Sequence, residues 1–242
     1  MELQVLASGS SGNCYLLKDG PDTLLLDAGI PYKKILKGVG FRLKGIAGAL
    51  ITHEHQDHAA AIKDLTHAGI PCCMTFGTRE ALGMANTPPL IDIRAYGKFK
   101  IGPFMILPFP AKHDAADPVG FLIRNTRTGE QMIYATDTYY LPHTFPGVNY
   151  WLVECNFTDA LITDETPEYL KNRLTKSHMS LERLCGVFRA NDLTSSRQIV
   201  LCHLSSERGD ADIMTNTIQR LTHKPVTVAA PGVTIPLNMH PF

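Results

Sequence analysis

The segment Thr52-His-Glu-His-Gln-Asp-His58 constrains this chain more than any other part of its sequence. Its potential metal ligands are His53, His55, Asp57 and His58. The apolar run 46–51 before it is typical of a buried strand, and the run 59–65 after it is typical of a helix. The cluster is therefore expected on a strand-to-helix connection, where side chains can converge on one point.

Neutral imidazole and carboxylate oxygen are ligands that zinc and similar cations prefer. Because residues i and i+2 of an extended segment point the same way, His53 and His55 can bind one metal. Asp57 and His58 follow the bend and can face a second. The competing interpretation is a solvated polar loop, but the H-x-H-x-D-H spacing after a strand favours a metal site.

This segment resembles the signature of the metallo-β-lactamase superfamily, and other segments resemble its further motifs in the same order. Leu24-Leu-Leu-Asp-Ala-Gly29 resembles the first motif, in which an aspartate ends a strand near the metals. His113 resembles the third motif. Asp137, within Tyr134-Ala-Thr-Asp-Thr138, resembles the bridging carboxylate of the fourth. His203, within Ile199-Val-Leu-Cys-His-Leu204, resembles the last histidine, so the resemblance covers residues 3 to about 206.

Further segments resemble the YycJ/WalJ branch of this superfamily, whose members resemble nucleases. They are Leu6-Ala-Ser-Gly-Ser-Ser-Gly-Asn13, Ser177-His-Met-Ser-Leu-Glu182, Val153-Glu-Cys-Asn156 and His203-Leu-Ser-Ser-Glu207.

The resemblance implies a binuclear site with two divalent metal ions per chain. One ion would be bound by His53, His55 and His113, and the other by Asp57, His58 and His203, with Asp137 as the bridge. Zinc is the expected metal, and manganese or iron suit the same ligands. Such a pair of ions makes hydroxide available at neutral pH, as the hydrolysis of a phosphodiester, thioester or amide requires.

Some of these residues also have ordinary structural interpretations. His113 can be a surface loop residue, and Asp137 can be a turn residue or a helix cap. His178 competes with His203 for the last ligand position, and the strand-like run 199–201 favours His203. By resemblance, His178 in a polar loop is instead the proton donor to the leaving group, and the catalytic candidates are Asp57 and His178. The competing interpretation of His178 is a helix-start histidine without chemistry.

Other polar residues are expected around the ligands. Asp27 is expected to hydrogen-bond a ligand imidazole. Glu154 either does the same, contacts substrate, or is a buried carboxylate satisfied by backbone donors. The loop with Ser8, Ser10 and Asn13 is either a phosphate cradle or a plain turn. A basic run, Lys171, Arg173, Lys176 and Arg183, either contacts phosphate or is simply solvated.

Strand-like and helix-like runs alternate along the chain. Strands are expected at 3–7, 14–17, 23–26, 46–51, 72–75, 104–109, 119–123, 132–135, 150–153, 199–201 and 226–229, and helices at 31–37, 59–68, 78–84, 180–189 and 210–221. The pattern predicts an α/β fold, and the resemblance implies a four-layer αββα sandwich with mixed sheets. The interval from Asp137 to His203 leaves no room for the β-CASP domain of some related nucleases, so we expect a single domain over residues 1–242.

The formal net charge is zero, so there is no global basic field that gathers nucleic acid, and polyanions must bind to local patches. The six cysteines form no C-x-x-C pair and favour reduced thiols in the cytoplasm. The first residues show no basic and apolar signal pattern, and no run of about 18 apolar residues occurs, so we expect no signal peptide, no membrane span and no membrane partner.

We therefore expect a cytoplasmic metal-dependent hydrolase, foremost a phosphodiesterase acting on nucleic acid through a metal-bound hydroxide. The branch resemblance implies a 5′-to-3′ exonuclease, with DNA favoured over RNA. One alternative is a small-molecule hydrolase, such as a glyoxalase II-like thioesterase or a cyclic phosphodiesterase. Another is a catalytically silent metal-binding scaffold, against which the complete ligand set argues. The oligomeric state does not follow from the sequence.

Overall fold

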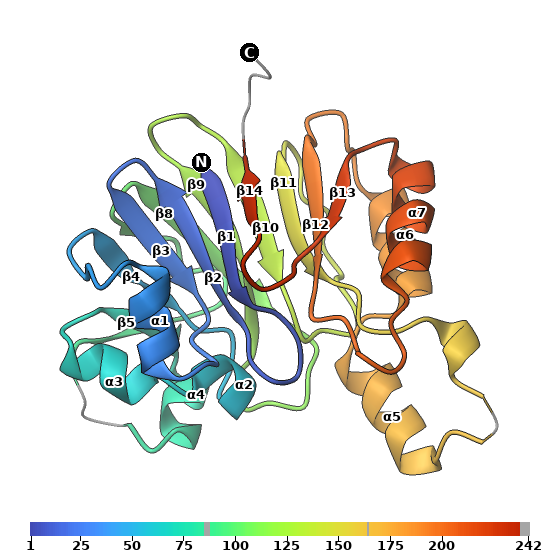
Figure 1. Ribbon diagram of the computed structural model, residues 1–242, viewed down its shortest axis with the longest axis horizontal. Helices are drawn as coiled ribbons and strands as arrows, with labels where there is room; N and C mark the ends of the chain where they lie inside the picture. Colours follow the sequence, from blue (N-terminus) through green and yellow to red (C-terminus); the bar gives the residue numbers. More distant parts are fainter. Residues whose placement is uncertain (85–87, 164, 238–242) are drawn as a thin grey trace.

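The computed structural model of the chain describes residues 1–84, 88–163 and 165–237. Two seven-stranded sheets pack face to face, and helices cover both outer faces (Figure 1). This is the four-layer αββα sandwich expected above, and its two mixed sheets confirm the α/β fold class.

The first sheet has the strand order β14-β1-β2-β3-β4-β5-β6. Its strands are β1 (Glu2–Ala7), β2 (Cys14–Asp19), β3 (Asp22–Leu26), β4 (Ile46–Leu50), β5 (Cys72–Thr75), β6 (Leu90–Ile93) and β14 (Thr234–Pro236). Pairs from β14 to β3 are antiparallel, and pairs from β3 to β6 are parallel. Because parallel neighbours need crossover connections, helices follow β3, β4 and β5. They are α1 (Tyr32–Gly38), α2 (Gln56–Ala59), α3 (Ile62–His67) and α4 (Phe76–Ala81).

The second sheet has the order β13-β12-β11-β10-β9-β8-β7. Its strands are β7 (Phe99–Ile101), β8 (Phe104–Pro110), β9 (Val119–Asn125), β10 (Gln131–Ala135), β11 (Tyr150–Glu154), β12 (Gln198–Cys202) and β13 (Val226–Val228). Pairs from β7 to β10 are antiparallel, and pairs from β10 to β13 are parallel. The short helix η1 (Asp159–Leu161) and the helices α5 (Glu168–Ser177), α6 (Leu181–Ala190) and α7 (Ala211–Thr222) complete the fold. In Figure 1, α6 and α7 cover the sheet, whereas α5 extends below it.

The two-residue period of the strands divides the apolar side chains between three cores. In β2, Tyr15 and Leu17 enter the central core between the sheets, whereas Cys14 and Leu16 enter the core under α1 and α3. Strand β11 is buried at every position because both of its faces are covered. These cores hold the strand ends in fixed positions along one edge of the sandwich.

One predicted helix is two in the structure. Residues 59–68 are not continuous, because the N–H of Ala61 donates to the carbonyl oxygen of Ala28 at 2.9 Å instead of extending a helix. In the same region, a Cβ atom on Gly29 would lie 1.6 Å from the carbonyl oxygen of Asp57. Only glycine permits this approach, which holds α2 against the end of β3.

The sequence does not predict β6, β7, β14, η1 or α5. Four of these are three or four residues long. Helix α5 buries only Leu174 and Ser177, so its apolar periodicity is weak. The other predicted strands and helices are present, with ends shifted by a few residues.

No helix in the described ranges has the length and apolar character needed to cross a membrane. All six cysteines are buried free thiols. Of the histidines outside the expected site, His67 and His223 are exposed and His143 is partly exposed. His240 lies outside the described residues.

Candidate metal centre

The candidate ligands gather at one edge of the sandwich, where the parallel strands of both sheets end. Side chains beyond the carboxyl ends of parallel strands are typically placed to bind ligands. Asp27 directly follows β3, Asp137 lies just beyond β10, and His203 directly follows β12. All three have left-handed φ angles, of 57°, 48° and 52°. Non-glycine residues rarely adopt this conformation, and such strain is concentrated at functional sites.

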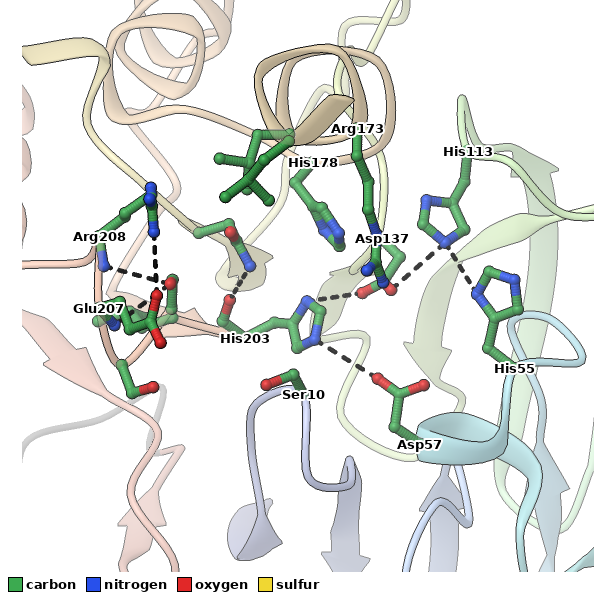
Figure 2. Close-up of a pocket in the computed structure, with 16 residues that line it drawn as sticks. Ser10, His55, Asp57, His113, Asp137, Arg173, His178, His203, Glu207 and Arg208 are labelled. Atoms are coloured by element: carbon green, nitrogen blue, oxygen red, sulfur yellow. Dashed lines mark hydrogen bonds and ion pairs between the residues drawn. The ribbon is translucent and has the colours of Figure 1, made fainter. Parts of the chain in front are cut away.

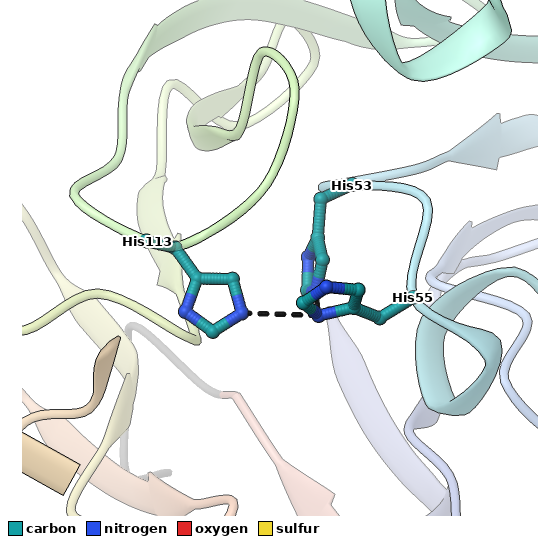
Figure 3. A group of neighbouring side chains, drawn as sticks. All are labelled: His53, His55 and His113. Atoms are coloured by element: carbon teal, nitrogen blue, oxygen red, sulfur yellow. Dashed lines mark hydrogen bonds between the residues drawn. The ribbon is translucent and has the colours of Figure 1, made fainter. Parts of the chain in front are cut away.

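His53, His55 and His113 form the first donor group (Figure 3). The Nδ1 atom of His55 lies 3.1 Å from Nε2 of His53 and 3.2 Å from Nε2 of His113. The other ring nitrogens of two of them are occupied, because Nδ1 of His53 lies 3.0 Å from Oγ1 of Thr52 and Nδ1 of His113 lies 2.8 Å from the carbonyl oxygen of Ser177. Tetrahedral nitrogen ligands of zinc are about 3.3 Å apart, since each is about 2.0–2.1 Å from the metal. The group therefore has the spacing that one cation requires.

Asp57, His58, Asp137 and His203 form the second donor group. The Nε2 atom of His58 lies 3.4 Å from Oδ2 of Asp57 and 3.3 Å from Oδ2 of Asp137. The Nε2 atom of His203 lies 3.7 Å from Oδ2 of Asp57, and its Nδ1 atom lies 2.8 Å from Oδ1 of Asp137. Two imidazoles and two carboxylates thus surround a second point.

Asp137 connects the two groups. Its Oδ2 atom also lies 3.5 Å from Nε2 of His113 and 3.7 Å from Nε2 of His53. Burial favours the neutral acid, but His203 and His58 outweigh it and hold the pKa of Asp137 well below its usual value. An ionised carboxylate between two imidazole groups is chemically suited to bridge two cations.

One atom of the second group lacks a hydrogen-bond partner. The Nε2 atom of His203 is buried and makes no hydrogen bond with any residue that the structure describes. Buried polar atoms are normally satisfied, so each exception needs an explanation. A divalent cation bound by the second group would satisfy this nitrogen, and imidazole with carboxylate suits zinc, manganese or iron.

Asp27 lies behind His58, on the side away from the other ligands. Its fully buried carboxylate accepts the N–H of Thr52 at 2.8 Å and the hydroxyl of Tyr134 at 2.5 Å, and it contacts Nδ1 of His58 at 2.7 Å. Burial disfavours the imidazolium, but Asp137 and Asp27 outweigh it and raise the pKa of His58. Because Nδ1 of His58 is held, its Nε2 atom is left to face the second group. This geometry supports the predicted role of Asp27 in orienting a ligand.

Glu154 joins the two histidines that compete for the last ligand position. Its Oε1 atom lies 2.7 Å from Nδ1 of His178 and 2.9 Å from Nδ1 of His203, and its Oε2 atom accepts two backbone N–H groups. Burial opposes protonation of His178, but Glu154 outweighs it and raises its pKa. These three residues and Asp137 form a third group of possible ligands. Of the two histidines, only His203 also belongs to the group with Asp57 and His58.

The surroundings of His178 differ from the expected polar loop. Ser177 is the last residue of α5, and Ser180 caps α6 by accepting the N–H of Arg183 at 3.3 Å. His178 therefore lies between two helices and is buried. Of the predicted basic run, only Arg173 lines the pocket beside the ligands, whereas the Arg183 guanidinium donates to backbone carbonyls.

The Ser8–Asn13 loop is tied mainly to the protein itself. The Oγ atom of Ser8 accepts the N–H of His203 at 3.0 Å. The Asn13 side chain accepts the N–H of Gly9 at 2.9 Å, and its amide nitrogen lies 3.0 Å from Nε2 of His58. Ser10 is exposed and lines the pocket, so it is the residue of this loop that is best placed to meet a ligand.

The ligands open into a pocket of about 260 Å³ (Figure 2). Helix α5 and the segment 204–208 form the walls opposite α2. Sequence reasoning did not single out several residues of these walls as site residues, namely Asn156, Leu170, Leu174, Ser205 and Arg208. Thr52 and Tyr134, which donate to Asp27, were missed as well. Thr52, Tyr134, Asn156 and Ser205 lie within the quoted motifs, whereas no sequence signal marks Arg208.

Known proteins are similar to this chain over most of its length. The profile of the Beta-lactamase superfamily domain matches residues 22–204. Exodeoxyribonuclease WalJ of Streptococcus pneumoniae is 28% identical over 236 residues, covering 90% of this chain and 84% of WalJ. Exodeoxyribonuclease YycJ of Bacillus anthracis is 24% identical over 241 residues, covering 91% and 89%. The metallo-β-lactamase fold protein YhfI of Bacillus subtilis superposes with a TM-score of 0.76 at 19% identity, covering 97% and 98% of the two chains.

Proposed function

Because the chain belongs to the metallo-β-lactamase superfamily of hydrolases, we propose that it is a binuclear metal-dependent nuclease, acting as a 5′-to-3′ exonuclease on DNA. The observation that carries this proposal is a pocket in which two donor groups joined by Asp137 face walls with arginine and serine side chains. Such walls suit an anionic, oxygen-rich substrate better than an acyl chain. The relatives named exodeoxyribonuclease support DNA as the substrate.

The two donor groups would hold the metal ions. His53, His55 and His113 would hold one, Asp57, His58 and His203 the other, and Asp137 would contact both. Two bound divalent ions, zinc foremost, supply a nucleophile at neutral pH and stabilise negative charge on the attacking and leaving oxygens. Asp27 and Ser8 position ligands, because the first holds His58 and the second holds the backbone of His203.

His178 is the proposed proton donor. Glu154 occupies its Nδ1 atom, so Nε2 is the nitrogen that can face the substrate in the pocket. No hydrogen bond from Nε2 to another described residue competes for this proton. The raised pKa of His178 favours a proton on the ring near neutral pH, where a leaving oxygen needs it.

The pocket favours attack at a chain end. At about 260 Å³ it lies below the roughly 300–1,000 Å³ of pockets for drug-sized ligands, so it suits a single terminal nucleotide. Arg173 points from α5 into this space (Figure 2) and forms no hydrogen bond or ion pair within the described ranges. With Ser10 on the opposite side, it is available to contact a terminal phosphate.

The six cysteines extend the proposal to the cellular location. All of them are buried free thiols. Unpaired thiols are typical of proteins in reducing compartments, so we place the protein in the cytoplasm.

The test compares substrates under each candidate metal. Protein loaded with zinc, manganese or iron is incubated with 5′- and 3′-end-labelled single-stranded DNA, the same RNA, and a thioester. We expect mononucleotides to be released from the 5′ end of DNA. Efficient thioester turnover without cleavage of nucleic acid under any of these metals would refute the proposal.

Variants distinguish the proposed roles of His178 and His203, the two histidines that contact Glu154. His178→Ala should retain both metals and lose about 10²–10⁴-fold in rate, the usual scale of general acid catalysis. His203→Ala should lose metal and activity together. His67→Ala, at an exposed position on α3, is the matched control and should change neither. Metal lost with His178→Ala but retained with His203→Ala would show that the two roles are reversed.

A further inference from the structure

The connection between β3 and β4 concentrates positive charge on one part of a neutral chain. Residues 28–53 contain no aspartate or glutamate. Their cations are Lys33, Lys34, Lys37, Arg42 and Lys44, which we call the α1 basic patch. All five are exposed, and none forms an ion pair within the part of the chain that the structure describes. Unpaired like charges repel one another, so the patch is suited to a polyanionic partner.

The patch leads away from the metal centre. Helix α1 begins shortly after Asp27 and lies on the outer face of the first sheet (Figure 1). From the far end of the patch, β4 runs back toward His53. Its five residues span about 16 Å at roughly 3.3 Å per residue. A single strand of several nucleotides, at about 3.4 Å or more per nucleotide, would cover this length.

The far end of the patch is hollowed. A cavity of about 160 Å³ lies there, and Lys18, Arg42 and Lys44 are among the residues that line it. Lys18 forms an ion pair with Glu2 at 3.4 Å. Arg42 and Lys44 form no ion pair with any residue that the structure describes, so their charges are available to a ligand. Several cations around one small hollow suit a phosphate group.

An aromatic ring lies beside these cations. Phe41 is 73% exposed, so its side chain contributes little to any core. Its φ of 59° is a conformation that favours glycine. Neither burial nor backbone geometry therefore explains a phenylalanine at this position. Exposed aromatic rings next to cations are typical of surfaces that bind single strands, because bases stack on the ring while the cations contact phosphates.

We propose that the α1 basic patch with Phe41 is a docking surface for the single-stranded part of a nucleic-acid substrate, several nucleotides from the end that enters the pocket. This inference rests on the proposed nuclease function. An anionic membrane is the less suitable partner, because a membrane-binding helix presents several apolar side chains, whereas Phe41 is the large exposed hydrophobic residue of this segment.

The first experiment measures binding. Metal-loaded protein is titrated against a fluorescent 20-nucleotide single strand with nuclease-resistant phosphorothioate linkages, and anisotropy is followed at several salt concentrations. The patch variant is Lys37→Gln, Arg42→Gln and Lys44→Gln. Single strands give a salt slope of about 0.7 per phosphate contact, so losing three contacts should lower the slope by about 2. We expect Kd to rise at least tenfold at low salt.

A matched variant controls for net charge. Lys100→Gln, Arg189→Gln and Arg220→Gln remove the same charge from exposed positions on β7, α6 and α7, and Kd should change less than twofold. Phe41→Gly should weaken binding at least about fivefold through lost stacking, with no fall in Tm, because glycine suits the backbone there. Equal binding by wild type and patch variant, or equal loss in the patch and control variants, overturns the docking surface.

Comparing a small phosphodiester with a long strand distinguishes an effect on docking from an effect on catalysis. Bis-p-nitrophenyl phosphate is too small to contact the patch while it occupies the pocket, so the patch variant should hydrolyse it within twofold of wild type. In contrast, KM for a 20-nucleotide strand should rise at least tenfold. If the protein cleaves no nucleic acid but the patch variant alone loses DNA binding, the nuclease proposal fails and the docking surface stands. Tighter binding of the patch to phosphatidylglycerol vesicles than to DNA would identify a membrane surface and overturn the inference.

Discussion

Replacing Asp27 by asparagine tests how the fold supports the metal centre. The substitution keeps the shape of the side chain, and asparagine tolerates the left-handed backbone at this position, where φ is 57°. One carboxylate oxygen becomes an NH₂ group. The oxygen that accepts the Thr52 N–H can remain, but the atom that meets Tyr134 and His58 becomes a donor.

The expected loss of stability follows from the groups that lose their hydrogen-bond acceptor. The Tyr134 hydroxyl and Nδ1 of His58 are fully buried and would each be left unsatisfied, at about 1–3 kcal/mol apiece. Because a buried ion pair also loses one partner, the free energy of unfolding should fall by about 3–5 kcal/mol. Total stabilities are about 5–15 kcal/mol, so this is a large fraction. Loss of the partner that orients His58 should also weaken metal binding about 10–100-fold at the second group.

Urea unfolding and metal titration measure the two effects separately. With a urea dependence of about 1–3 kcal/mol per M, the unfolding midpoint should fall by more than about 1 M. Tyr134→Phe is the control, because it removes one donor and leaves His58 held by Asp27. It should destabilise by about 1 kcal/mol without changing metal affinity. An Asp27→Asn protein that unfolds at the wild-type midpoint and binds two metals with wild-type affinity would refute this reasoning.

Three further predictions concern metal content, thiols and the pocket wall. Elemental analysis of reconstituted protein should approach two metals per chain and fall toward one in Asp57→Ala, and a ceiling of one in the wild type would contradict the binuclear proposal. Burial raises the pKa of Cys72 and of Cys73 to about 12 from 9.0, so a thiol reagent at pH 8 should label neither until the protein unfolds. In the unfolded protein the two thiols ionise near pH 9, before those of the folded protein. Their contribution to the free energy of unfolding is therefore complete below pH 9 and is lost as the pH rises toward 12. Unfolding measured across that range would detect this loss. Arg173→Gln should raise KM for DNA about tenfold, because a charge-assisted phosphate contact is lost. Lys176→Gln on the same helix does not line the pocket and should leave KM unchanged, so equal effects would exclude a specific role for Arg173.

The local sequence pattern was sufficient to predict most of the strands and the first segment of candidate ligands. Apolar runs with a two-residue period predict most strands because each strand must divide its side chains between two cores, as Tyr15 and Leu16 do. The Thr52–His58 segment is equally local, since four potential ligands lie together on one strand-to-helix connection. The resemblance then identified Asp137 and His203 as candidates, although it could not show the distances between them. The single-domain organisation remains a prediction.

Tertiary structure decided what depends on residues far apart in the sequence. The break between α2 and α3 comes from a hydrogen bond between Ala61 and Ala28, which no helical periodicity encodes. Helix α5 is a pocket wall although its weak apolar pattern does not predict a helix. Glu154 touches both His178 and His203, so neither motif alone reveals that the two share one carboxylate. Propensity and periodicity act over a few residues, whereas close approach and the satisfaction of buried polar atoms are settled only when the two sheets pack together.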